Sequence, residues 1–232
     1  IEVMRNNIGR NGSLYIYGQG GQSGRLIVRG GRADENALKP HGVAGNGAGI
    51  GGQGGVKDDN DNCCGNGHIY GGTVEAYGAP HAAGIGGAYV NHSYGYGWGD
   101  QDFHLGALAR VKAVGGEGAA GVGGCHNTGA PMPSDAGAGA TSKWFNLYNA
   151  SQLEVTGGNG APAIGHGRGS PRDPNSTLYI HTEKVEIFQQ INEGAPQKQT
   201  PGGSSGKWTY ICNKKVLPPD YKETLRILAY NQ

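Results

Sequence analysis

The sequence predicts an all-β fold, a parallel β-helix or β-solenoid built from about four glycine-rich repeats. Three observations lead to this prediction: a large excess of glycine, a short strand-like segment that occurs four times, and a second element that follows it at a regular spacing. A β-prism or a trefoil made from the same repeats is the alternative arrangement, and it is also all-β.

Glycine supplies 47 of the 232 residues, whereas its usual share of a protein is roughly 7%. A collagen helix would need glycine at every third position, and a disordered chain would contain few apolar β-forming residues. Neither description fits, because valine, isoleucine, leucine and tyrosine recur at regular places. We therefore expect the glycines in ordered turns and at close approaches of the backbone.

The first repeated element is a short strand that ends near a glycine. In each copy an apolar residue alternates with another residue, which is typical of a half-buried strand followed by a turn. The four copies span residues 26–31, 74–79, 111–116 and 153–158, and they begin at Leu26, Val74, Val111 and Leu153.

The second repeated element places a branched residue among alanine and glycine. Its four copies span residues 48–52, 83–87, 120–124 and 162–166 and contain Ile50, Ile85, Val122 and Ile164. From the first residue of the strand to this branched residue the spacing is 11 in the last three copies. It is 24 in the first copy, which carries an insertion around residues 34–41.

The branched residues recur 35, 37 and 42 residues apart, a period typical of solenoids, propellers and arrays. One copy of this length cannot bury its own apolar face, so neighbouring copies must stack like residue on like residue. We therefore expect Ile50, Ile85, Val122 and Ile164 to form a buried ladder. No ten-residue segment before position 217 has helical periodicity, which favours a parallel β-helix.

The chain divides into three parts by composition. Residues 1–191 are predicted to form the glycine-rich β-repeat domain, with two further strands in 176–191, and residues 192–206 a linker or long loop. Residues 207–232 are predicted to form a C-terminal cap that runs into a short helix after Pro219, with Asp220 as its N-cap. Solenoids need caps because open strand edges associate with one another.

One copy of the repeat resembles a known type of bacterial repeat. Residues 71–78 read GGTVEAYG and residues 82–87 read AAGIGG, which resembles the glycine-rich repeats of large surface proteins of gut and environmental bacteria. The resemblance covers residues 24–170 and implies carbohydrate binding or adhesion. The copies here vary in length and the last reads Ala-Ile-Gly-His, which suggests a specialised single domain. The resemblance supplies no catalytic residue.

Charge and hydropathy exclude several functions. The 19 basic and 18 acidic residues nearly cancel and no stretch is strongly basic, so a nucleic-acid partner is not expected. No run of 18 apolar residues is present, so insertion into a membrane is not expected. The glycine-rich fragments 18–21 and 84–88 are not followed by a helix, which argues against nucleotide binding.

The cysteines predict two disulfide bonds. Cys63, Cys64, Cys125 and Cys212 contain no C-x-x-C pair, which argues against a zinc ribbon. Adjacent cysteines in extended backbone point to opposite sides, so Cys63 and Cys64 would each bond a distant partner. With four N-x-[ST] triplets, these bonds predict a secreted or cell-surface protein. Four reduced thiols in a reducing compartment is the alternative.

An acidic segment suggests calcium as a cofactor. Residues 58–62 read Asp-Asp-Asn-Asp-Asn, and oxygen atoms from such side chains coordinate hard cations. The candidate ligands are Asp58, Asp59 and Asp61. The segment lacks the glycine and the distal glutamate of an EF-hand, so a solvated acidic turn is the alternative.

An aromatic segment predicts a carbohydrate site. In extended backbone, aromatic residues that alternate with glycine point to one side, and aromatic faces beside carboxylate and amide groups suit sugars. The candidate binding residues are Tyr94, Tyr96, Trp98, Asp100, Gln101 and Asp102. A satellite cluster of core rings is the alternative.

We therefore expect an extracellular carbohydrate-binding or adhesive surface protein whose partners are glycans. The first alternative is a structural, filament-forming component that self-associates. The second is a polysaccharide lyase or glycosidase, for which the candidates are Asp100, Asp102, His104, Arg110 and Lys112. A metal or acid–base site at His126 and His166 is a further hypothesis. The sequence favours a protein without catalytic activity.

Overall fold

The computed structural model describes residues 13–18, 24–32, 45–52, 66–90, 103–126, 145–169, 176–212 and 217–230. Every regular element in these ranges is a β-strand and none is a helix, which confirms the predicted all-β class. Accordingly, this part of the chain contains no helix that is long and apolar enough to cross a membrane.

Sheet 1 contains seven strands, of which the first five run parallel. These five are β1 (Ser13–Ile16), β5 (Asn66–Ile69), β9 (Phe103–Leu105), β12 (Phe145–Tyr148) and β15 (Ser176–His181). Beyond β15 the sheet continues antiparallel with β19 (Lys207–Cys212) and β18 (Gly202–Ser204). The repeats were predicted from the sequence, but the sheet 1 strands that precede them were not.

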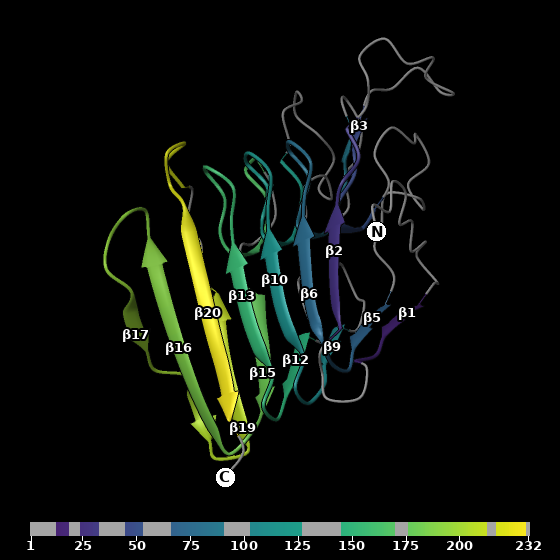
Figure 1. Cartoon of the computed structure of the whole chain (residues 1–232). Helices are drawn as coiled ribbons and strands as arrows, with labels where there is room; N and C mark the ends of the chain where they lie inside the picture. Colours follow the sequence, from purple (N-terminus) through teal and green to yellow (C-terminus); the bar gives the residue numbers. More distant parts are fainter. Residues whose placement is uncertain are drawn as a thin grey trace.

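Sheet 2 also has seven strands, and it contains the first repeated element. Its parallel strands are β2 (Arg25–Arg29), β6 (Thr73–Tyr77), β10 (Arg110–Val114) and β13 (Gln152–Thr156). Next come β20 (Glu223–Tyr230), β16 (Lys184–Ile191) and β17 (Gln197–Gln199), with antiparallel pairing throughout. Figure 1 shows this sheet facing the viewer, with β20 between β13 and β16.

Sheet 3 contains the second repeated element as four parallel two-residue strands. They are β4 (Ile50–Gly51), β7 (Ile85–Gly86), β11 (Val122–Gly123) and β14 (Ile164–Gly165). The four branched residues pair in register, and each is at most 1% exposed. The predicted buried ladder is therefore confirmed. A separate antiparallel pair joins β3 (Gly45–Asn46) to β8 (Tyr89–Val90).

The second residue of each sheet 3 strand must be glycine. Gly123 has a φ of 131°, a conformation that residues with a Cβ atom rarely adopt. A Cβ atom on Gly123 would lie 2.1 Å from the carbonyl oxygen of Gly165 in the next strand. That same oxygen accepts a hydrogen bond of 2.9 Å from the amide of Gly124. The glycines therefore allow the close backbone approach on which stacking depends.

In four successive stretches of the chain, a sheet 1 strand is followed by a sheet 2 strand and then a sheet 3 strand, as in β5, β6 and β7. The core lies between the sheets, where equivalent residues of successive repeats contact one another. Sheet 1 contributes Ile69, Leu105 and Leu147, which are paired in register and fully buried. Burial of each such side chain contributes roughly 1.5–3 kcal/mol, so the stacked ladders dominate stability.

The C-terminal region differs from its prediction. Residues 223–230, near the predicted short helix after Pro219, form strand β20. Leu225, Ile227 and Ala229 alternate inward along this strand and are buried, so the period is two rather than that of a helix. The predicted linker at 192–206 contains the short strands β17 and β18. The two strands expected in 176–191 are present as β15 and β16.

Candidate functional site

Several predicted site residues lie outside the described ranges. They are the carbohydrate candidates Tyr94, Tyr96, Trp98, Asp100, Gln101 and Asp102, and the calcium candidates Asp58, Asp59 and Asp61. Both sites therefore stay predictions. Within the described ranges, no three His, Cys, Asp or Glu side chains come together in a way that could hold a metal ion.

Two of the four cysteines lie within the described ranges and two lie outside them. Cys63 and Cys64 lie outside the described ranges, whereas Cys125 and Cys212 are 2% and 5% exposed. Cys125 follows β11 in sheet 3, and Cys212 ends β19 in sheet 1. The predicted disulfide bonds to Cys63 and Cys64 stay predictions.

The outer face of sheet 1 carries a row of aromatic rings. Side chains alternate between the two faces of a strand, so the residues flanking a buried aliphatic residue point outward. In β1 and β5 these outward residues include Tyr15 and His68, which are paired in register. We call the following set the ring row: Tyr15, Tyr17, His68, Tyr70, His104, Tyr148 and His181.

Successive members of the ring row are stacked. The ring centroids of Tyr15 and His68 are 4.6 Å apart, and those of His68 and His104 are 4.9 Å apart, with planes within 8° of parallel. The row continues from His104 to Tyr148 at 5.8 Å and from Tyr148 to His181 at 4.9 Å. In its interior, both faces of each ring are covered by neighbouring rings, which leaves ring edges for contact with a ligand.

The end of the ring row at β1 is different, because β1 is the outermost of the described strands on that side of sheet 1. Tyr15 and Tyr17 lie side by side, with centroids 6.5 Å apart and planes inclined by only 10°. One side of this pair stacks on His68 and on Tyr70, the latter at 5.3 Å. Tyr15 is 51% exposed and Tyr17 is 69% exposed. The pair therefore presents aromatic surface to solvent.

The opposite end of the ring row is more enclosed. The Nε2 atom of His181 lies 2.8 Å from Oδ1 of Asn146, so His181 carries its proton on Nε2 and donates it to the amide oxygen. Burial lowers the pKa of His181, and the nearby His104 and Lys207 lower it further. This histidine is therefore neutral at physiological pH.

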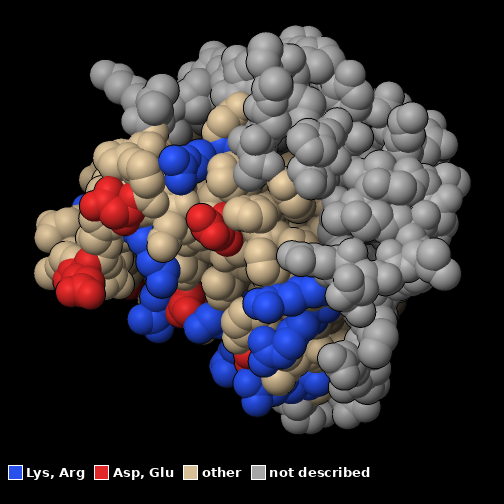
Figure 2. Space-filling model, turned by 90° about the horizontal axis from the view of Figure 1, so that it is seen from above, with Lys and Arg blue, Asp and Glu red and all other residues tan. Residues whose placement is uncertain are grey.

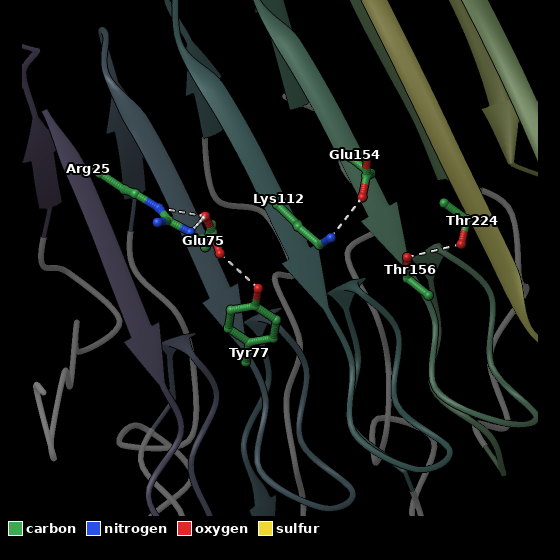
Figure 3. A network of polar contacts seen from close by, with 7 residues as sticks. All are labelled: Arg25, Glu75, Tyr77, Lys112, Glu154, Thr156 and Thr224. Carbon is green, nitrogen blue, oxygen red and sulfur yellow. Dashed lines mark hydrogen bonds and ion pairs between the residues drawn. The ribbon is translucent and has the colours of Figure 1, made fainter. Parts of the chain in front are cut away.

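The outer face of sheet 2 is charged (Figure 3). Nε of Arg25 donates a 2.8 Å hydrogen bond to one carboxylate oxygen of Glu75, and the Tyr77 hydroxyl donates one of 2.8 Å to the other. The hydrogen bonds from Tyr77 and Arg25 lower the pKa of Glu75. On the next two strands, Nζ of Lys112 lies 3.0 Å from the carboxylate of Glu154. The hydrogen bond to Glu154 raises the pKa of Lys112.

Basic side chains predominate on this face. In Figure 2, Lys and Arg gather along the lower margin of the described part of the molecule, the side occupied by sheet 2 in the view of Figure 1. Arg110 and Lys112, named above as candidates for a polysaccharide-active site, both point outward from β10 on this face. His104, named with them, belongs to the ring row on sheet 1.

The metal or acid–base site at His126 and His166 stays a hypothesis, and the structure places a different histidine, His81, beside His126. The Nδ1 atom of His126 lies 2.9 Å from Nδ1 of His81, so one ring donates and the other accepts. His166 is 5% exposed. The pairing of Gly123 with Gly165 aligns His166 with Gly124 rather than with His126, whose equivalent is Arg168. The close histidine pair is therefore His81 with His126.

No family model matches the chain, and comparison with curated proteins and with solved structures finds no similar one. The outer faces of sheets 1 and 2 are therefore the basis for assigning a function. The ring row was not predicted, although its pattern is visible in the sequence. Tyr15-Ile-Tyr17 and His68-Ile-Tyr70 each place an inward aliphatic residue between two outward rings. Tyr148 and His181 each follow a buried aliphatic residue.

Proposed function

We propose that this protein binds carbohydrate through the paired rings of Tyr15 and Tyr17 at the edge of sheet 1. Apolar C–H faces of sugars stack on aromatic rings, and nearby polar groups bind the hydroxyls. The observation that carries the proposal is the 51% and 69% exposure of two neighbouring, nearly parallel rings. Contiguous exposed apolar surface on a folded domain commonly marks a binding site.

The layer of rings beneath the pair supports this assignment. The Tyr70 hydroxyl lies 3.4 Å from Nδ1 of His68, and both residues stack with the exposed pair. They hold Tyr15 and Tyr17 in fixed orientations, so little side-chain entropy is lost when a sugar binds. The Tyr70 hydroxyl and the His68 imidazole also bring hydrogen-bonding groups close to the platform.

The scaffold that we propose is a β-solenoid, in which each repeat forms one turn through sheets 1, 2 and 3. Parallel pairing in register in all three sheets supports this arrangement over a prism or a trefoil. A stack of this kind holds its outward side chains at fixed positions from turn to turn. This regular spacing suits the recognition of a polymer.

The wider setting that we propose is extracellular, on a cell surface or in secretion, with glycans as partners. The paired exposed tyrosines support it, and the predicted disulfides and sequons agree with it. The aromatic segment at residues 94–98 and calcium at residues 58–61 belong to the same proposal as further elements of recognition.

The test is a glycan array, followed by calorimetric titration of the best ligand with wild type and with Tyr17→Ala. Loss of one stacked ring is expected to weaken binding about 10-fold or more, on the scale of base–aromatic stacking. The matched control is Tyr230→Ala, which removes a tyrosine that is 39% exposed on β20 in sheet 2. Binding is expected to be unchanged in this control.

A third variant distinguishes ring faces from ring edges. Tyr148→Ala removes a ring whose faces are covered by His104 and His181. If the ligand stacks on exposed faces, this variant binds like wild type. An array without any bound glycan, or an equal loss in all three variants, would refute the platform.

A structural, filament-forming role is the second candidate, because β1, β2 and β4 end their sheets at one side of the described part of the molecule. At the other end the edge strands are β18, β17 and β14, which are two or three residues long. Short edge strands limit strand addition. Ordered polymers on electron-microscope grids would favour this second candidate over glycan binding.

A further inference from the structure

A shallow trough of about 200 Å³ crosses the outer face of sheet 2. Two rows of outward side chains form its walls, and each row is paired in register across β6, β10, β13 and β20. One row consists of Thr73, Arg110, Gln152 and Leu228, and the other of Glu75, Lys112, Glu154 and Arg226. Four strands at the usual spacing give the trough a length of about 14 Å.

The charges in and beside the trough do not balance. Glu75 is bound by Arg25 and Tyr77, and Glu154 is paired with Lys112. Both carboxylates are therefore already neutralised by basic side chains of the same face.

Two arginine side chains of the trough, Arg110 and Arg226, are not used in these ion pairs. The structure gives Arg110 and Arg226 no ion pair with any described residue, although both are exposed and line the trough. Arginine presents five N–H donors in a planar fork that matches the oxygens of a carboxylate or a sulfate. The remaining donors therefore favour an anionic ligand.

We propose that this trough binds an acidic polysaccharide, with Arg110 and Arg226 holding anionic groups on different sugar units. The inference deepens the proposed function, since it names the class of glycan, but it uses a different face from the tyrosine platform. The backbone positions of the two arginines are two strands and one row apart, about 12 Å at the usual spacings. Such a separation suits a polymer with repeated charges better than a single small anion.

The neutral lining of the trough fits the same ligand. The Gln152 amide and the Thr73 hydroxyl lie in the row of Arg110 and supply donors and acceptors for sugar hydroxyls. Leu228, at the end of that row beside Gln152, adds a small apolar surface. Anchoring charges with neutral polar and apolar contacts between them are what a charged sugar chain requires.

The experiment compares dextran, dextran sulfate and polygalacturonate as probes of the full chain, by calorimetry at low and at physiological salt. Dextran and dextran sulfate differ only in their sulfate groups, and polygalacturonate carries carboxylates instead. We expect one or both acidic polymers to bind, with affinity that falls as salt rises, and dextran not to bind in the trough. Which acidic polymer binds more tightly identifies the anionic group.

The test variant is Arg110→Gln/Arg226→Gln, for which we expect affinity for the acidic polymer to fall at least about 10-fold. The charge-matched control is Lys184→Gln/Lys207→Gln, which removes two exposed cations outside the trough. Its affinity is expected to change less than about 2-fold. Arg110→Lys/Arg226→Lys retains the charge but loses the planar fork, so an intermediate loss would support paired hydrogen bonding.

An equal loss in the test and control variants would overturn the proposal in favour of diffuse attraction to a basic surface. Absence of binding to both acidic polymers would also overturn it. Neither result affects the tyrosine platform, which is tested with Tyr17→Ala on array glycans. Conversely, a failed platform with intact binding to the acidic polymer would leave the trough as the site of recognition.

Discussion

The parallel repeats and the antiparallel C-terminal end provide hydrogen-bond acceptors for the same backbone amide position in different ways. Within the repeats, backbone amides donate hydrogen bonds to backbone carbonyls of the next repeat. For example, the amide of Gly49 donates to the carbonyl of Ala83 at 3.2 Å. At the last repeat, the equivalent amide of Ala163 donates instead to a side-chain carboxylate oxygen of Glu223, at 2.7 Å. The same backbone position is satisfied by a neighbouring repeat in one region and by a single side chain in the other.

This difference between the repeats and the C-terminal end shows which positions restrict the choice of residue. A repeat requires small residues wherever its backbone touches the next repeat, so those positions recur as glycine and alanine. The end requires one acceptor at one place, and Glu223 is 2% exposed and also accepts a hydrogen bond from the Gln189 side chain. A buried carboxylate with two donors satisfies groups that would otherwise lose their hydrogen bonds to water.

The largest expected effect separates the two regions directly. Gly123→Ala would place a Cβ atom 2.1 Å from the Gly165 carbonyl oxygen, at a φ that alanine rarely adopts. We expect a loss of about 4 kcal/mol or more in the free energy of unfolding, because only separation of β11 from β14 relieves the contact. Urea denaturation followed by circular dichroism measures this loss.

The matched control lies in the antiparallel end. Gly202→Ala, in the exposed strand β18, would bring its Cβ atom no closer than 3.3 Å to the Thr209 side chain. We expect it to cost less than about 1 kcal/mol. Similar losses in Gly123→Ala and Gly202→Ala would contradict the distinction between the two regions.

The second effect concerns the capping carboxylate. Glu223→Ala leaves the Ala163 amide buried without its acceptor, and we expect it to cost about 2–3 kcal/mol. Glu223→Gln keeps an oxygen that accepts from the Ala163 amide. The Gln189 side chain can turn so that its oxygen accepts from the NH2 group of the new glutamine. We therefore expect a smaller loss in the free energy of unfolding. The midpoint of urea unfolding measures both variants. Equal losses would mean that the carboxylate does not act as the acceptor we describe.

The smallest effect comes from two histidines, His81 and His126, that neighbouring repeats bring into contact. Burial lowers the pKa of His126 to about 4, and the charges of His81 and Arg168 add to this effect. In the unfolded chain the pKa is about 6.5, so between pH 6.5 and pH 4 the unfolded chain binds more protons than the folded one. Stability should therefore fall as the pH falls through this window.

We expect this histidine to account for about 1 kcal/mol of that fall, allowing for its partial exposure. Chemical denaturation at pH 7 and at pH 4 measures it in wild type and in His126→Phe, which keeps a ring but cannot take up a proton. The variant should lose less stability on acidification. Equal losses in the two proteins would contradict the assignment.

The repeats could be predicted because their contacts are between equivalent residues. Ile85 meets Ile50 and Val122, so the apolar pattern that marks one copy also identifies its neighbours. The end could not be predicted in this way. Leu225, Leu228 and Ala229 fit helical spacing after Asp220, but the pairing of β20 with β13 and β16 lies outside any local window. Tertiary pairing outweighs local propensity there.

The candidate sites show the same limit. Rings separated by glycine at residues 94–98 were conspicuous in the sequence, whereas Tyr15 and Tyr17 were not, because an alternating strand is ordinary by itself. Their significance depends on His68 and Tyr70 stacking against them from a strand some fifty residues later. Likewise, the shared trough of Arg110 and Arg226 exists only because β20 joins sheet 2 beside β13.

The position of β20 also has a consequence for biosynthesis. Proteins fold in part as they leave the ribosome, N-terminal segments first. The parallel strands can stack in the order in which they emerge, because each pairs with the strand made just before it in its sheet. Strand β16 cannot, since its place in sheet 2 is separated from β13 by β20, which is made later. During translation β16 must therefore wait for β20 before it can join sheet 2.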